Sequence, residues 1–192
     1  MVIGLTGGIG CGKSAASACF ARRGFLVVDA DALAREVLGS PACVDQMVGR
    51  WGRACLDREG APDRSWIAAK VFADPTERAF LEGLTHPEVA RRRALAVADR
   101  SRSHVVEIPL LFEKNLAGEF DVVVCVSSSE PVRLRRLEQR GLSPAAAKAR
   151  MNSQAPLDEK VRKSDHVLYN DGDLDFLDAQ VGALVARLQA AS

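Results

Sequence analysis

The sequence lacks an excess of charge of either sign. Its 192 residues include 26 lysines and arginines against 25 aspartates and glutamates, which gives a formal net charge of +1. A protein that binds nucleic acid or an anionic membrane over a broad surface usually carries a strong positive charge. We therefore expect no nucleic-acid partner and no membrane partner, and any basic cluster has to be judged locally.

Paired cysteines and long apolar runs are also missing. The absence of a C-x-x-C pair argues against a zinc site, and an odd number of unpaired cysteines is typical of the reducing cytosol, so we expect a cytoplasmic location. No apolar run is long enough to span a bilayer, and the first residues lack the basic segment of a signal peptide. The five cysteines are Cys11, Cys19, Cys43, Cys55 and Cys125.

The most informative stretch that is present is VIGLTGGIGCGKS. Val2–Thr6 is short, apolar and partly β-branched, which predicts a buried strand. Gly7–Ser14 then matches the phosphate-binding pattern G-x-x-x-x-G-K-[ST] at every fixed position. Lys13 would supply charge for the β- and γ-phosphates of a nucleotide, and Ser14 would offer a hydroxyl to Mg²⁺. Cys11, inside the pattern, is interpreted as a small side chain that fills space rather than as a redox group.

A second short strand, Phe25–Val28, is followed by two carboxylates, Asp29 and Asp31. In open α/β sheets, ligands bind at the carboxyl ends of the strands. The two carboxylates are therefore candidates for metal binding or for base catalysis beside the phosphate loop. Asp31 would also be a good N-cap for a helix predicted over Ala32–Leu38, so both roles stay open. Glu107, near the end of a third strand, is a further acidic candidate for Mg²⁺.

Residues 39–102 have a helical pattern, and the rest of the chain alternates between strands and helices. In the helical part, a helix over 75–84 is expected to end before a second one that runs from Pro87 to about residue 100, with Thr85 or His86 as its cap. Strands that alternate with helices indicate a parallel sheet covered on both faces. The remaining predicted strands are 104–108, 121–126 and 166–169.

Arginines concentrate in two places. Arg91–Arg93 is interpreted as a solvated helix face, with the alternative that one arginine meets an anionic substrate. The helix predicted over 130–140 carries Arg136 and Arg140 on one face, and Arg150 lies on the helix that follows. A helical hairpin that projects arginines over a phosphate loop can supply charge to a transferring phosphoryl group. We favour this lid over a solvent-exposed basic face.

Several segments, in order along the chain, closely resemble one family, the dephospho-CoA kinases, which act last in coenzyme A synthesis. The phosphate loop alone is not specific, but the Asp-Ala-Asp at 29–31, the pair His86-Pro87 and the run Pro109-Leu110-Leu111-Phe112-Glu113 are. The resemblance covers nearly the whole chain. The other matching residues are Ala34, Arg35, Leu84, Thr85, Arg140, Arg150, Gln154, Asp165 and Asn170.

The resemblance implies a three-layer α/β/α P-loop kinase with a parallel five-stranded sheet. Residues 1–30, 103–132 and 164–192 would form the nucleotide-binding core, residues 31–102 a helical substrate domain, and residues 133–163 a lid. The implied reaction moves the γ-phosphoryl group of ATP to the ribose 3′-hydroxyl of dephospho-CoA, with Mg²⁺ as cofactor. We expect a monomer that acts on this small-molecule substrate.

The resemblance also implies roles for single residues. Asp31 matches the proposed base and would hold Mg²⁺ through a water molecule, while Ser14 would bind the metal directly. Lys13 and Arg140 would stabilise the transferred group. The nucleotide would contact Gly8, Gly10, Cys11, Gly12, Lys13, Ser14, Ala15, Arg140 and Asn170, the last beside the adenine. Dephospho-CoA would contact Asp31, Arg35, His86, Pro109 and Leu110.

Two positions depart from the family pattern. Ala15 stands where many members carry a second hydroxyl, so one hydrogen bond to the α-phosphate is expected to be missing. Glu107 stands where some members have aspartate or an apolar residue, which leaves its metal role open. A kinase for another nucleoside or small phosphorylated acceptor would use the same core and lid. A switch GTPase or ATPase fits less well, because the D-x-x-G-like run Asp57–Gly60 has no strand before it and no N-K-x-D motif is present.

Overall fold

The apolar run Val2–Gly7 forms β1, the central strand of a parallel five-stranded sheet. The structure, a computed structural model, describes residues 1–190. In the register of the sheet, Leu5 is level with Glu107 on one neighbouring strand and with Val124 on the other. The strands lie in the order β2 (Leu26–Asp29), β3 (His104–Glu107), β1, β4 (Val122–Ser127) and β5 (His166–Tyr169).

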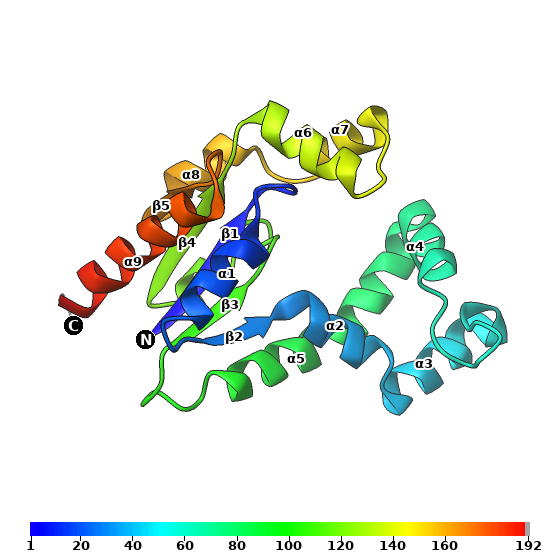
Figure 1. The fold of residues 1–192 in the computed structure, drawn as a ribbon. Helices are drawn as coiled ribbons and strands as arrows, with labels where there is room; N and C mark the ends of the chain where they lie inside the picture. Colours follow the sequence, from blue (N-terminus) through cyan, green and yellow to red (C-terminus); the bar gives the residue numbers. More distant parts are fainter. Residues whose placement is uncertain (191–192) are drawn as a thin grey trace. The chain divides into compact units, whose positions relative to one another are not determined.

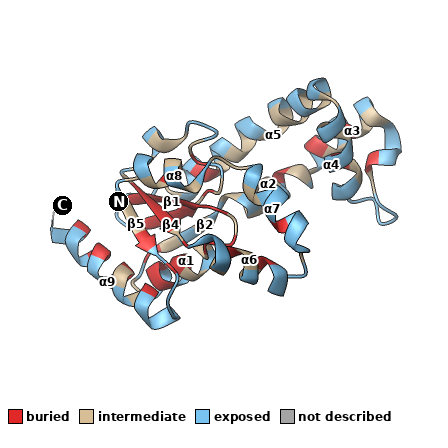
Figure 2. Ribbon diagram, turned by 90° about the horizontal axis from the view of Figure 1, so that it is seen from above, coloured by how far each residue is buried: buried red, intermediate tan, exposed pale blue. Residues whose placement is uncertain are grey.

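Helices cover both faces of this sheet (Figures 1 and 2). On one face, α1 (Lys13–Ala21) and α9 (Leu174–Ala190) contribute to the main core, into which Ile3 and Leu5 point from β1. On the other face, α8 (Leu157–Lys163) contacts β1 and β4. These layers confirm the predicted α/β/α fold with five parallel strands. Both faces of the sheet are covered because successive side chains of β1 point to opposite faces, and the apolar side chains on each face pack against helices.

Two further helices lie in the same part of the chain as the sheet. α6 (Glu130–Gln139) follows β4, and α7 (Pro144–Asn152) packs against it after a turn at Gly141. Ser143 caps α7, since its side chain accepts a hydrogen bond from the Ala146 N–H. The predicted arginine-bearing hairpin is therefore present, and its action as a lid stays a prediction.

The chain divides into two units, one formed by Met1–Asp29 with Asp99–Ser192 and the other by Ala30–Ala98. The second unit is helical, with a small core of its own around Cys43, Met47, Cys55 and Ile67. Glu77 joins two of its helices, because its carboxylate accepts hydrogen bonds of 2.7 Å from both Arg50 and Trp51. The elements are α2 (Ala30–Leu38), α3 (Pro41–Trp51), the 3₁₀ turn η1 (Gly52–Cys55), α4 (Arg64–Ala73) and α5 (Pro75–Ala96).

The predicted break before Pro87 is wrong. α5 runs without interruption from Pro75 to Ala96 with Pro87 inside it, so neither Thr85 nor His86 is a helix cap. The Thr85 hydroxyl instead donates to the Leu81 carbonyl one turn earlier, at 2.8 Å. α5 contacts α2, α3 and α4 along its length, and this packing outweighs the single backbone hydrogen bond that proline removes.

The start of α2 also differs from the prediction. The helix begins at Ala30, so Asp31 lies in its first turn rather than at the N-cap. A carboxylate in the first turn is still favourable there, because it meets the positive end of the helix dipole. Among residues 1–190, no helix combines the length and the apolar character that a membrane span requires.

Candidate phosphate-binding site

The loop between β1 and α1 has the conformation of an anion cradle. Gly10 and Gly12 have φ angles of +82° and +89°, a region that side chains disfavour. A Cβ at Gly12 would also collide with the side-chain amide of Asn170. Gly12 is the N-cap of α1 and offers no side chain to cap it. The positive end of α1 therefore faces the loop, as expected for a phosphate site.

Lys13 and Ser14 open α1 directly after this loop. The Lys13 Nζ donates to the Gly7 carbonyl at 3.2 Å, which brings its charge back across the loop. The Ser14 hydroxyl donates to the Glu107 Oε2 at 3.3 Å. Glu107 is level with Asp29 on the neighbouring strand. Hydroxyl and carboxylate oxygens suit Mg²⁺, which needs few protein ligands because it keeps waters and binds phosphates. Within residues 1–190 there is no cluster of three or more His, Cys, Asp or Glu that could hold a metal.

The back of the loop is held by Asn170 and Ser128. The Asn170 Nδ2 donates to the Cys11 carbonyl at 2.8 Å, and the Ser128 hydroxyl donates to the Asn170 carbonyl at 2.8 Å. Asn170 is 3% exposed, so its amide supports the loop backbone. Cys11 is fully buried, and this burial raises the pKa of its thiol. A protonated, inaccessible thiol agrees with the interpretation of Cys11 as a space-filling residue.

Two arginines of α6 pack against the same loop; the sequence placed Arg136 on the face expected over the loop, but it did not single out Arg133. The Arg133 Nε donates to the Ile9 carbonyl at 3.0 Å. Arg136 donates to the carbonyls of Asn170 and Gly10, at 2.9 and 3.4 Å. Arg140, which the sequence favoured, lies exposed at the C-cap of the helix. The helical spacing of the three arginines places them on neighbouring turns of α6.

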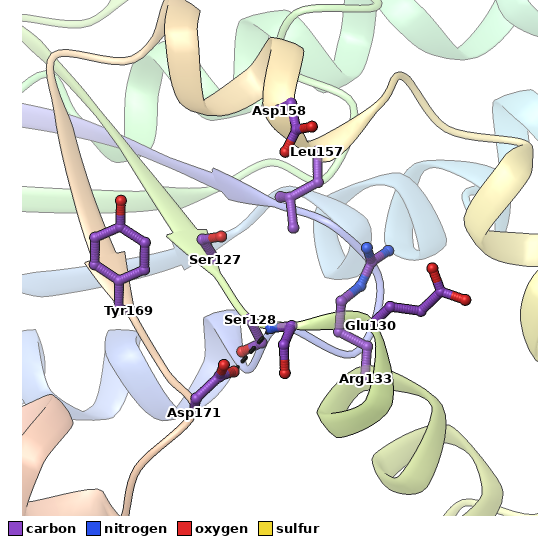
Figure 3. A pocket seen from close by; sticks show the side chains of 9 residues that line it. Ser127, Ser128, Glu130, Arg133, Leu157, Asp158, Tyr169 and Asp171 are labelled. Carbon is purple, nitrogen blue, oxygen red and sulfur yellow. Dashed lines mark hydrogen bonds between the residues drawn. The ribbon is translucent and has the colours of Figure 1, made fainter.

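A cavity of ≈ 480 Å³ adjoins this network at the carboxyl ends of β4 and β5 (Figure 3). Two residues of its lining are joined by a hydrogen bond, which the Ser129 N–H donates to the Asp171 carboxylate at 2.8 Å; it is drawn as a dashed line in Figure 3. Arg133 is shared between the cavity and the phosphate loop. The cavity lies at the sheet edge where open α/β folds bind ligands. Its lining residues are Ser127, Ser128, Ser129, Glu130, Arg133, Leu157, Asp158, Tyr169 and Asp171.

The predicted site residues fall into both units of the chain. The phosphate-loop residues, Pro109, Leu110, Arg140 and Asn170 belong to the unit that contains the sheet. Leu110 is 38% exposed in the turn that follows β3. The helical unit contains three exposed residues of the predicted site, namely Asp31 and Arg35 in α2 and His86 in α5.

Comparisons with known proteins agree with this geometry. The family model described as dephospho-CoA kinase matches residues 1–175. A dephospho-CoA kinase of Syntrophotalea carbinolica is 47% identical over 98% of this chain and 92% of its own length. The crystal structure of TT1252 from Thermus thermophilus superposes with a TM-score of 0.86 at 34% identity, covering 98% of this chain and 97% of that one. The dephospho-CoA kinase from Campylobacter jejuni superposes with a TM-score of 0.74 at 26% identity, covering 99% and 98%.

Proposed function

The chain belongs to the dephospho-CoA kinase family and is an ATP-dependent kinase of the last step of coenzyme A biosynthesis, and we propose how its residues carry out that step. The reaction transfers the γ-phosphoryl group of ATP to the ribose 3′-hydroxyl of dephospho-CoA and releases ADP. The observation that carries the proposal is the phosphate loop, with Lys13 folded back over it and Ser14 beside Glu107.

The phosphate loop binds the triphosphate of ATP. The N–H groups of the loop and the start of α1 contact phosphate oxygens, and Lys13 balances the charge of the β- and γ-phosphates. The Ser14 hydroxyl would hold Mg²⁺, with Glu107 as a second oxygen donor and Asp31 acting through water. When bound, Mg²⁺ neutralises charge on the β- and γ-phosphoryl oxygens. Ala15 offers no hydroxyl to the α-phosphate, so that contact is left to backbone groups.

Asp31 is the residue that orients the acceptor and accepts its proton. A ribose hydroxyl is a poor nucleophile while it keeps its proton, and a carboxylate within hydrogen-bond reach can take that proton as the bond to phosphorus forms. Two features support this role. Asp31 follows the end of β2 by two residues and is exposed, so its carboxylate is accessible. Asp29, at the end of the strand itself, is the alternative that has to be tested beside it.

Arg140 stabilises the charge that develops on the transferred group, as part of a lid formed by residues 133–163. Its exposure at the end of α6 supports this role, because an arginine that acts only on a bound nucleotide has to be accessible. Arg133 and Arg136 have a different task, since their hydrogen bonds go to the loop backbone. We assign them to holding the loop in its binding conformation.

Dephospho-CoA binds to the helical domain, residues 31–102, and to the turn after β3. Arg35 and His86 are exposed on their helices and offer positive charge or hydrogen bonds to phosphate and ribose oxygens. His86 is inside α5, so a role as helix cap no longer competes with substrate binding. Pro109 and Leu110 supply apolar contact to the substrate.

The test is the dependence of ADP release on the acceptor. With ATP and Mg²⁺ present, ADP release is measured with dephospho-CoA, adenosine, AMP or no acceptor. We expect turnover with dephospho-CoA and only background hydrolysis with the other three. Comparable turnover with adenosine or AMP would identify a kinase of broader acceptor range, and turnover that needs no acceptor would point to an ATPase.

A further inference from the structure

The short segment after α7, residues 154–160, contacts the phosphate loop through Gln154. The Oε1 atom of Gln154 accepts a hydrogen bond from the Ile9 N–H at 2.9 Å. On the other side of the same residue, the Ile9 carbonyl accepts a hydrogen bond from Arg133 at 3.0 Å. Both backbone groups of Ile9 are therefore bound to side chains from the two ends of the α6–α7 hairpin. The Ile9 N–H is directed to Gln154, so it is not one of the groups that turn toward phosphate.

Six residues later, the same segment contains a lysine with no exposed surface. The Lys160 Nζ donates to the Glu113 carboxylate and to the Pro109 carbonyl, each at 2.7 Å. Glu113 also accepts a hydrogen bond from the Ala155 N–H at 2.9 Å. The Lys160 ammonium and this backbone N–H hold the pKa of the Glu113 carboxyl below its usual value, against the effect of burial. The ion pair joins the segment to the turn after β3.

Lys160 adds two contacts to the turn after β3, which also has backbone hydrogen bonds of its own. Residues 109–115 form consecutive turns without a helix or a strand. A buried ammonium needs an oppositely charged or hydrogen-bonding partner, and removing that partner lowers the free energy of unfolding. Lys160 therefore fixes both ends of the Pro109–Glu113 run, one through a backbone carbonyl and the other through a carboxylate. A displacement of about 1 Å at a reacting group can cost about 100-fold in rate, so a fixed turn has catalytic value.

We propose that Gln154 and Lys160 are two separate positioning residues on one segment, with Gln154 setting the phosphate loop for ATP and Lys160 setting the Pro109–Glu113 turn for dephospho-CoA. The proposal rests on the proposed function, in which that turn contacts the acceptor. It predicts a separation of effects that a merely structural role would not produce. Loss of stability alone would lower the amount of active enzyme and would leave both substrate constants unchanged.

Gln154→Met tests the phosphate-loop half of the proposal. Methionine has a similar length but replaces the amide oxygen with a thioether sulfur, which is only a weak acceptor for the Ile9 N–H. A typical net hydrogen bond corresponds to about 3- to 10-fold in affinity. We expect the Kd for ATP to rise by about that factor, with an unchanged KM for dephospho-CoA. Gln180→Met is the matched control, because Gln180 makes the same kind of hydrogen bond, at 2.9 Å, to the backbone of Tyr169. Wild-type ATP affinity in a folded Gln154→Met would overturn this half.

Lys160→Met combined with Glu113→Gln tests the acceptor half. The double variant leaves no buried charge, and glutamine can still accept the Ala155 hydrogen bond. We expect the KM for dephospho-CoA to rise about tenfold or more, because a displaced turn loses its alignment with the substrate, while the Kd for ATP stays unchanged. Glu113→Gln alone leaves the buried Lys160 ammonium without its carboxylate, so the KM for dephospho-CoA should rise in this variant as well.

Lys160→Arg is measured in parallel, so that the result does not depend on folding of the double variant. Its planar guanidinium keeps the charge that Glu113 needs but cannot occupy the position of an ammonium, so the KM for dephospho-CoA should rise again. A wild-type KM in either folded Lys160 variant would overturn this half. Wild-type turnover with dephospho-CoA is measured first, and its absence would contradict the proposed function rather than the positioning roles.

Discussion

Replacing Asn170 with alanine distinguishes support of the phosphate loop from contact with adenine. The family resemblance puts Asn170 beside the base, whereas its buried amide donates to the Cys11 carbonyl at 2.8 Å. In Asn170→Ala, that carbonyl keeps only a weaker contact with the Ser128 hydroxyl at 3.3 Å. The Arg136 contact is retained, because it goes to the backbone carbonyl of residue 170. The substitution therefore removes one defined support of the loop.

The expected cost follows from that single hydrogen bond. Leaving a buried acceptor without a partner costs about 1–3 kcal/mol, and we take about 2 kcal/mol for a carbonyl that keeps a weak second contact. In a protein of this size, 1 kcal/mol corresponds to about 2–4 °C in Tm, so the Tm should fall by about 4–8 °C. If the phosphate-bound conformation of the loop carries about 1.4 kcal/mol more of this cost than the free loop does, nucleotide affinity falls about tenfold.

The assay compares ATP with inorganic tripolyphosphate, which has the phosphates but no base. Calorimetric Kd values are measured for both ligands with the wild type and with Asn170→Ala. Support of the loop predicts that both affinities fall by the same factor. Asn152→Ala, a change at the exposed end of α7, should alter neither. A weaker affinity for ATP with an unchanged affinity for tripolyphosphate would contradict support of the loop and would indicate that Asn170 contacts adenine.

Three further changes test other parts of the site and of the fold. Arg140→Ala should lower kcat by about 10³-fold with little change in ATP affinity, and an equal loss in both, from steady-state kinetics and calorimetry, would indicate uniform binding instead. Asp31→Asn should lower kcat by about 10²- to 10⁴-fold while its Tm is retained, and a greater loss of kcat in Asp29→Asn would contradict the assignment. Arg91 and Arg92 lower the pKa of Glu88 from 4.5 to about 2. The ion pairs of Glu88 with these arginines therefore stabilise the fold above about pH 4.5, and this contribution disappears as the pH falls through about 2. Glu88→Gln should accordingly flatten the acid side of a Tm–pH curve, and an unchanged curve would show that these ion pairs contribute nothing.

The parts of the fold that were predictable are encoded in contiguous residues. The strand Val2–Gly7, the glycine turn and the start of α1 at Lys13 follow one another in one short stretch, and local rules describe each of them. The parallel sheet followed from the alternation of strands and helices. The prediction for Pro87 was wrong because a local rule was applied where packing of α5 against α2, α3 and α4 decides the outcome.

The contacts that position the site could not be read from local patterns. Gln154 meets Ile9 across 145 residues of sequence, and Asn170 meets Cys11 across 159. Arg133 and Arg136 were visible as basic residues on a helix, but nothing in their spacing shows that their donors reach backbone carbonyls of the loop. Such contacts depend on how the chain after β4 returns to the sheet, which a pattern of apolar and polar residues does not determine.

The central claim is that this chain transfers the γ-phosphoryl group of ATP to dephospho-CoA at the phosphate loop around Lys13. The most direct measurement is a single turnover with γ-labelled ATP and dephospho-CoA, comparing wild type with Lys13→Ala. We expect label on the 3′-position of the acceptor with the wild type. In Lys13→Ala we expect weakened ATP binding together with strongly reduced transfer, because the Lys13 charge serves both ground state and transition state. Label released as inorganic phosphate, or transfer at a wild-type rate by Lys13→Ala, would contradict the account.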